Sequence, residues 1–176
     1  SPWVWVLIAA LVVLAVLVAV LAVVRSRRND AARWNWGARD TARRSGDAAR
    51  RLQQAAAGLG SPAADRQVWL DTIEELASLS AAAAALVPDA PRAPGDPEGT
   101  NTLASGLDSL RSDLAVLRSA AVEAERTRFE LVGPTAEQLD FATRSVEQAA
   151  AAVVGDSHAV AAAVDRVDPP QPTVPP

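Results

Sequence analysis

The strongest pattern along the chain is an uninterrupted apolar run from Trp3 to Val24. The run is 22 residues long and contains no charged or amide side chain and no Gly or Pro. As a helix it reaches about 33 Å, which exceeds the roughly 30 Å of hydrocarbon in a bilayer. A backbone exposed to lipid must satisfy its own N–H and C=O groups, so such a run forms a helix. The sequence therefore predicts a transmembrane anchor over residues 1–24.

A cleaved signal peptide is the main alternative to an anchor. Signal peptides have a basic segment, a shorter apolar core and a cleavage site of small residues. In this chain Ser1 and Pro2 precede the apolar run, and Arg25 follows it directly. We therefore expect an uncleaved anchor, although a basic segment upstream of Ser1 would revive the alternative.

The residues that flank the run predict how it lies in a membrane. Trp3 and Trp5 mark the outer interface, because the indole ring is apolar and its N–H is polar. Arg25, Arg27 and Arg28 mark the inner interface, because Arg near a span stays on the cytoplasmic side. The prediction is a single-pass protein of the cell membrane with its N-terminus outside and residues 25–176 in the cytoplasm.

One face of the predicted span carries spacings that suit helix packing. Large side chains alternate four and three residues apart, which aligns them along the helix; they are Leu7, Leu11, Leu14, Val18 and Leu21. Ala15 and Ala19 form a small-xxx-small pair, which permits close approach of helices in lipid. Dimerisation through this face is one hypothesis, and chance spacing in a span rich in Leu, Val and Ala is the other.

Helical periodicity continues through the rest of the chain. We expect an Arg-rich juxtamembrane helix over residues 25–57, with Ser61 and Pro62 opening the next helix. Residues 88–99 hold four Pro and two Gly and are expected to form a loop. Thr135 and Gln138 fit a capping box that opens a last helix, and Gly155 is a candidate for a kink or break within it. The clearest seam alternates four and three residues apart: Leu103, Leu107, Leu110, Leu114, Leu117, Ala121 and Ala124.

These elements predict an all-α protein in which one N-terminal transmembrane helix precedes an antiparallel helical bundle or coiled-coil domain. The bundle is expected over residues 62–167, followed by a Pro-rich disordered tail over residues 168–176. The rival architecture is an extended coiled coil that buries its seams only in an oligomer. The Ala- and Val-rich seams bury less apolar surface than Leu seams, which makes help from a partner chain plausible.

Charge is distributed unevenly along the chain. Residues 25–51 carry nine Arg against three Asp, and residues 52–176 carry eight Arg against eighteen acidic residues. The basic segment predicts contact with the bilayer through anionic lipid headgroups. The simpler interpretation is that these Arg set topology and pair with Asp30, Asp40 and Asp47. Nucleic acid is an unlikely partner, because acidic residues interrupt the basic segment and no nucleic-acid-binding motif is present. The absence of Lys and the abundance of Ala are typical of a GC-rich bacterial genome.

The catalytic inventory of the sequence is poor. There is no Cys and a single His, His158, which follows Asp156 and Ser157 directly. Neighbours this close on one helix cannot supply the converging geometry of a catalytic triad. No metal-ligand spacing, phosphate-binding loop or dinucleotide fingerprint is present, so we expect no metal and no cofactor.

The sequence therefore predicts a non-enzymatic, membrane-anchored interaction or scaffold protein. Its partner is expected to be a protein bound through helical faces, or a second copy of the chain. The alternative is an accessory subunit of a larger membrane complex, whose span packs against the helices of other subunits.

Overall fold

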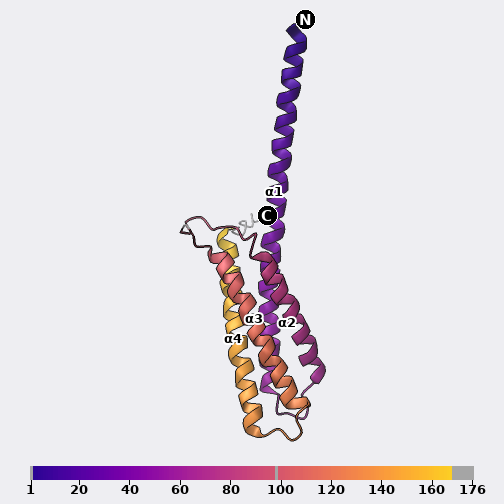
Figure 1. Cartoon of the computed structure of the whole chain (residues 1–176), viewed down its shortest axis with the longest axis vertical. Coiled ribbons are helices and arrows are strands. Elements are labelled where there is room, and N and C mark those ends of the chain that lie inside the picture. Colours follow the sequence, from indigo (N-terminus) through magenta and orange to yellow (C-terminus); the bar gives the residue numbers. More distant parts are fainter. Residues whose placement is uncertain (1, 98, 168–176) are drawn as a thin grey trace, which may run out of the picture. The chain divides into compact units, whose positions relative to one another are not determined.

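The computed structural model describes residues 2–97 and 99–167, which form four α-helices (Figure 1). The helices are α1 (Pro2–Ala57), α2 (Arg66–Leu86), α3 (Thr102–Phe129) and α4 (Ala136–Val167). Helix accounts for 83% of the described residues, and no strand occurs among them. The predicted all-α class, with a long apolar N-terminal helix and packed helices behind it, is confirmed.

The chain divides into two compact units, Ser1–Trp36 and Gly37–Pro176. The second unit is a four-helix bundle made of the part of α1 from Gly37 onward together with α2, α3 and α4. This division differs from the expected one, which began the bundle at residue 62. Residues 37–57 belong with the bundle because their apolar face is buried in it.

Neighbouring helices of the bundle run antiparallel. Between α1 and α2, Gly37 lies against Leu86 while Arg51 pairs with Glu75. Contacts between the other neighbouring helices follow the same order. Arg66 contacts Glu125 and Ser80 contacts Arg111 between α2 and α3. Gly106 lies against Val160 and Asp113 against Asp156 between α3 and α4, while Arg39 contacts Asp165 and Ala56 contacts Thr143 between α1 and α4. An up-and-down bundle with short connections has this order.

The core of the bundle is built around the leucine seam of α3. Every member of the predicted seam is at most 1% exposed: Leu103, Leu107, Leu110, Leu114, Leu117, Ala121 and Ala124. The largest buried side chain, Trp69 on α2, lies in the same core. The prediction that these heptad-spaced positions form the buried face of a helix is confirmed.

The bundle part of α1 contributes mainly small residues to this core. The buried row consists of Ala38, Ala42, Ser45, Ala49, Leu52 and Ala56, and Leu59 extends it into the connection. Gly46 is also buried, and a Cβ placed there would lie 3.6 Å from the Cβ of Ser157 on α4. Small side chains therefore let α1 and α4 approach closely.

The predicted helix boundaries have mixed outcomes. The capping box is confirmed, because the Thr135 N–H donates to Oε1 of Gln138 at 2.9 Å and the Gln138 N–H donates to Oγ1 of Thr135 at 3.1 Å. The predicted start at Ser61 is wrong: α2 begins at Arg66, and Oδ1 of Asp65 caps it by accepting from the Gln67 N–H.

Contacts from α3 explain the later start of α2. The guanidinium of Arg128 donates to the carbonyl oxygens of Leu59 and Ser61, and the Ser61 carbonyl also accepts from the Ala64 N–H. These bonds hold residues 59–64 as a turn. Capping rules consider only neighbouring residues in the sequence, so they could not predict this tertiary contact.

The Pro-rich segment forms the connection between α2 and α3. Residues 87–97 and 99–101 connect α2 and α3 without a helix, as predicted for the 88–99 loop. Helix α4 runs through Gly155 without a break. The predicted disordered tail, residues 168–176, lies outside the described residues.

Truncation of the leucine seam should destabilise the bundle. Leu114→Ala removes a fully buried side chain, so we expect the free energy of unfolding to fall by about 2–5 kcal/mol. Urea unfolding of the full chain in a mild detergent, followed by circular dichroism, measures this change. Val122→Ala, at a site that is 39% exposed on the same helix, is the matched control and should change it by less than about 0.5 kcal/mol. Equal effects of the two substitutions would contradict the core assignment.

The continuity of α4 gives a second prediction. Nothing lies within 4 Å of a Cβ added at Gly155, and the residue is inside a helix, so Gly155→Ala should stabilise the bundle by about 0.5–1 kcal/mol. Gly133 has φ +64°, where a side chain is strained, so Gly133→Ala should destabilise it by about 1–2 kcal/mol. The same urea experiment compares the two, and a loss of stability in Gly155→Ala would mean that the helix is broken there.

Candidate functional site

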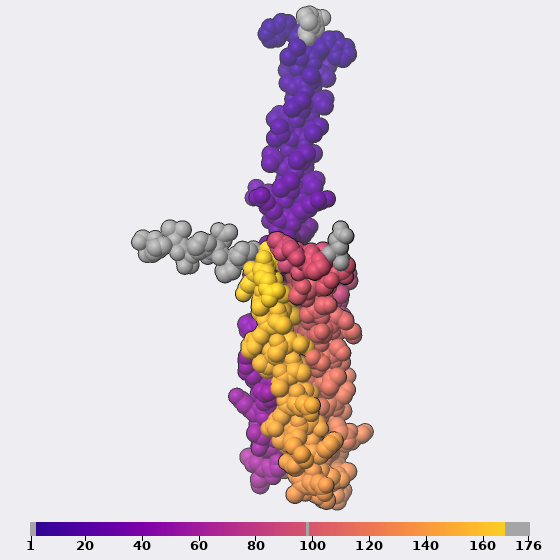
Figure 2. All heavy atoms as spheres, turned by 90° about the vertical axis from the view of Figure 1, so that its left-hand side faces the viewer, coloured from indigo at the N-terminus to yellow at the C-terminus, as the bar shows by residue number. Residues whose placement is uncertain are grey.

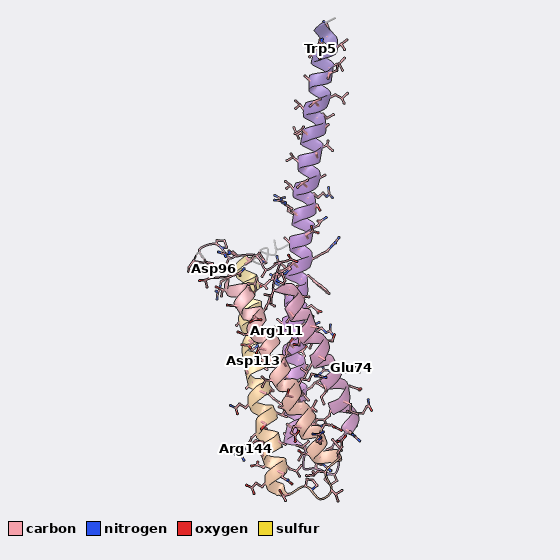
Figure 3. The ribbon with its side chains drawn as sticks, in the orientation of Figure 1. Trp5, Glu74, Asp96, Arg111, Asp113 and Arg144 are labelled. Atoms are coloured by element: carbon pink, nitrogen blue, oxygen red, sulfur yellow. The ribbon has the colours of Figure 1, made fainter. Side chains whose placement is uncertain are left out.

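The N-terminal unit presents a helix that is apolar on all sides. An 18-residue window of α1 has a mean hydropathy of 3.4, and none of the window is buried. Every large apolar side chain from Trp3 to Val24 is exposed, from 42% at Val24 to 76% at Trp3 and Trp5. Figure 3 labels Trp5 near the N-terminal end of α1. The structure thus contains one helix, among the described residues, that is long and apolar enough to cross a membrane.

Two other kinds of helix meet the same criterion of length and composition. The core helix of a soluble protein meets it but is mostly buried, whereas this helix is not buried within its own chain. A signal sequence also meets it, and this helix lies near the N-terminus. The exposure of this helix therefore argues against a core helix, whereas its position near the N-terminus is shared by an anchor and a signal sequence.

The predicted packing residues of the span lie on the exposed surface of α1. The large side chains are 58–65% exposed; they are Leu7, Leu11, Leu14, Val18 and Leu21. Ala15 and Ala19 are exposed as well. A single chain supplies no partner for these residues, so their role in helix association stays a prediction.

The basic residues divide into two groups with different surroundings. Arg25, Arg27 and Arg28 are exposed on α1, and no carboxylate of the described residues pairs with them. Farther along α1, Arg43 binds Asp40 at 2.8 Å, and this hydrogen bond and the charge of Asp40 raise the pKa of Arg43 above its usual value.

The Arg residues of the bundle part of α1 are occupied by ion pairs. Arg50 pairs with Asp47 at 3.3 Å, while Arg51 and Arg44 both reach Glu75 on α2. Of the pairings predicted for Asp30, Asp40 and Asp47, those of Asp40 and Asp47 therefore form within α1. Arg25, Arg27 and Arg28, which form no such ion pairs among the described residues, lie near the start of the basic segment.

One end of the bundle is tied by a second group of charges. Arg66 at the start of α2 donates to Glu125 at 2.5 Å and to Glu130 at 3.0 Å. The Glu125 side chain is only 8% exposed, so this pair satisfies a buried carboxylate. Removing Arg66 would leave that charge buried without a partner, which is far costlier than losing a surface pair.

Two acidic residues that the sequence did not indicate as a pair, Asp113 and Asp156, face each other between α3 and α4. Asp113 lies on α3 and is labelled in Figure 3; it interacts with Asp156 on α4. Oδ2 of Asp156 is buried from solvent. Burial, followed by hydrogen bonding to Asp113 and repulsion from its charge, raises the pKa of Asp156 to about 7. In the sequence, Asp113 stands directly before Leu114 of the α3 seam, and no spacing or motif connects it with Asp156.

The residues around His158 do not converge on a reactive centre. The hydroxyl of Ser157 donates to the Val153 carbonyl at 2.8 Å within α4. Nε2 of His158 lies 3.4 Å from a guanidinium nitrogen of Arg50, and Asp156 faces Asp113. Among the described residues, no three His, Asp or Glu side chains are grouped so as to hold a metal ion.

The acidic pair should make the stability of the bundle depend on pH. The pKa of Asp156 is about 7 in the folded chain and about 3.9 in an unfolded one, so the folded state binds the extra proton between these values. Stability should therefore fall as pH rises from about 4 to above 7. Asp156→Asn should abolish this slope and raise the unfolding temperature at pH 8 by roughly 2–4 °C, the shift that about 1 kcal/mol produces.

Thermal unfolding of the full chain in detergent at pH 5, 6, 7 and 8 measures that slope. Asp140→Asn is the matched control, because Asp140 is an exposed carboxylate of the same helix that pairs with Arg144. An unchanged pH slope in Asp156→Asn would show that Asp156 does not bind the proton.

The comparisons with known proteins return no relative. The chain matches no protein-family model, no curated protein and no solved structure.

Proposed function

We propose that this chain is a non-enzymatic, single-pass membrane protein whose helical bundle serves as an interaction or scaffold domain. The observation that carries the proposal is the fully exposed apolar helix from Trp3 to Val24. The bundle supplies the second part, because it buries its own core and leaves charged outer faces for partners.

Exposure of the apolar helix to water would be very unfavourable. Burying one large apolar side chain is worth about 1.5–3 kcal/mol, and the N-terminal unit exposes such side chains on all faces. A contiguous apolar surface of this extent marks a membrane or protein contact. Lipid satisfies every face at once, whereas a single protein partner would cover only one.

The charges and aromatic residues at the ends of the helix support an orientation. Trp3 and Trp5 suit the outer interface, and the unpaired Arg25, Arg27 and Arg28 suit the cytoplasmic one. In this orientation the three Arg side chains are free to contact anionic headgroups, and the bundle is cytoplasmic.

Two kinds of partner are consistent with this architecture. In the leading proposal the partner binds the bundle, and it is another protein or a second copy of this chain. In the alternative, the chain is an accessory subunit whose span packs against foreign helices through the Leu7–Leu21 face. Purification in mild detergent followed by mass spectrometry separates them, because stoichiometric membrane subunits favour the alternative.

Charge placed in the span should release the chain from the membrane. An Arg at the centre of a span costs roughly 2.5–3.5 kcal/mol, so Leu11→Arg combined with Leu14→Arg should prevent stable insertion. We expect the wild-type chain to stay in the membrane pellet after alkaline carbonate extraction and the double variant to leave it. Val122→Arg, on the bundle, is the control and should behave as wild type.

The intact mass of the membrane-bound chain tests the signal-sequence alternative in the same samples. Retention of residues 2–24 supports an anchor. A mature chain that lacks them, or a wild-type chain that carbonate extracts, would refute the proposal.

Sidedness is testable because the chain has no Cys. Arg92→Cys places one thiol in the exposed connection between α2 and α3. A membrane-impermeant maleimide should label it only after the cells are lysed, since we place the bundle in the cytoplasm. Labelling of intact cells would put the bundle outside and overturn the orientation.

A further inference from the structure

The outer face of α3 and α4 carries an open groove of about 690 Å³. Figure 2 views the bundle from the side on which α4 lies, with α3 beside it. Val116 on α3 and Phe141 on α4 line the groove and are 55% and 67% exposed. Both side chains point away from the core, so the bundle itself does not need them to be apolar.

The groove is shaped to admit another helix. Small residues line it between the two apolar side chains, namely Ser119, Ala120, Ala142 and Ser145. Its α3 side runs from Val116 to Thr127, which is about 16 Å or three helical turns. Two antiparallel helices with small residues between them form a furrow into which the side-chain ridge of a third helix packs.

The charged side chains that line the groove are all acidic. Its lining contains two charged side chains, Glu123 and Glu137, and no Arg. Among the described residues Glu137 forms no ion pair, and the guanidinium of Arg126 is 3.9 Å from Glu123, with both side chains more than 60% exposed. Glu137, in the first turn of α4, therefore carries a negative charge without a side-chain partner at the edge of the groove.

We propose that the α3/α4 groove binds an amphipathic helix of a partner protein, with an apolar row seated against Val116 and Phe141 and flanking Arg or Lys side chains paired with Glu123 and Glu137. The inference rests on the proposed function, because it names the face and the partner chemistry of the interaction domain. Charge complementarity selects a basic helix over an acidic one.

A pair of peptides tests the charge and the apolar row together. The probes are two synthetic 14-residue helices with the same row of Leu, one flanked by Arg and the other by Glu, each labelled with a fluorophore. The full chain is held in nanodiscs of phosphatidylcholine, whose neutral surface does not attract Arg, and empty nanodiscs give the background. Fluorescence anisotropy should show binding of the Arg-flanked peptide and at least tenfold weaker binding of the Glu-flanked one.

Matched variants locate the binding site. Phe141→Ala should weaken binding of the Arg-flanked peptide about tenfold, and Glu137→Gln should weaken it and reduce its dependence on salt. Val122→Ala and Asp140→Asn, which lie on the same two helices outside the groove, should leave affinity unchanged. Circular dichroism confirms that each variant keeps its helices.

Several outcomes would overturn the proposal. Absence of binding, equal affinity for the two peptides, or equal affinity of Phe141→Ala and Val122→Ala would each do so. A photoreactive benzoylphenylalanine in place of Phe141 that cross-links to a second copy would assign the groove to self-association instead. Carbonate extraction tests the anchor without the groove, so failure of one hypothesis is distinguishable from failure of the other.

Discussion

The bundle depends on close packing of the leucine seam of α3 within an interior to which α1 and α4 contribute mainly Ala, Ser and Val side chains. Leu107, Leu110 and Leu114 are fully buried, and a Cβ at Gly106 would lie only 3.4 Å from Val160 on α4. With two Phe and no Tyr in the whole chain, bulk comes from leucine and from Trp69 on α2, and closeness comes from alanine and glycine. Interiors packed in this way leave little slack, so the positions of the helices are mutually constrained.

Polar contacts then select one arrangement from those that such a core permits. The buried carboxylate of Glu125 requires Arg66, and Arg128 binds the carbonyl groups of Leu59 and Ser61 in the connection that follows α1. A helix that slipped by one turn would leave Glu125 buried without its partner, and that penalty exceeds the net gain from the pair. Asp113 and Asp156 oppose each other at the α3/α4 interface and make this contact sensitive to protonation. The core thus holds the helices together, and the charged residues define their register.

Sequence rules for spacing and capping gave correct predictions where neighbouring residues of one helix determine the structure. The seam of α3 and the capping box at Thr135 follow from spacing along one helix, and the structure has both. They failed at Ser61, where a guanidinium from α3 holds the turn, and at Gly155, which lies inside the continuous helix α4. The groove beside Phe141 could not be predicted from the sequence either, because its two walls come from different helices.

The sequence by itself determined the helical class, the apolar stretch from Trp3 to Val24 and the buried face of α3, because periodicity and composition are properties of single segments. Only the tertiary structure decided that residues 37–57 belong to the bundle, that Asp113 opposes Asp156, and that Val116 and Phe141 border one groove. Those facts depend on which helix faces which, and that choice arises from packing among all four helices at once.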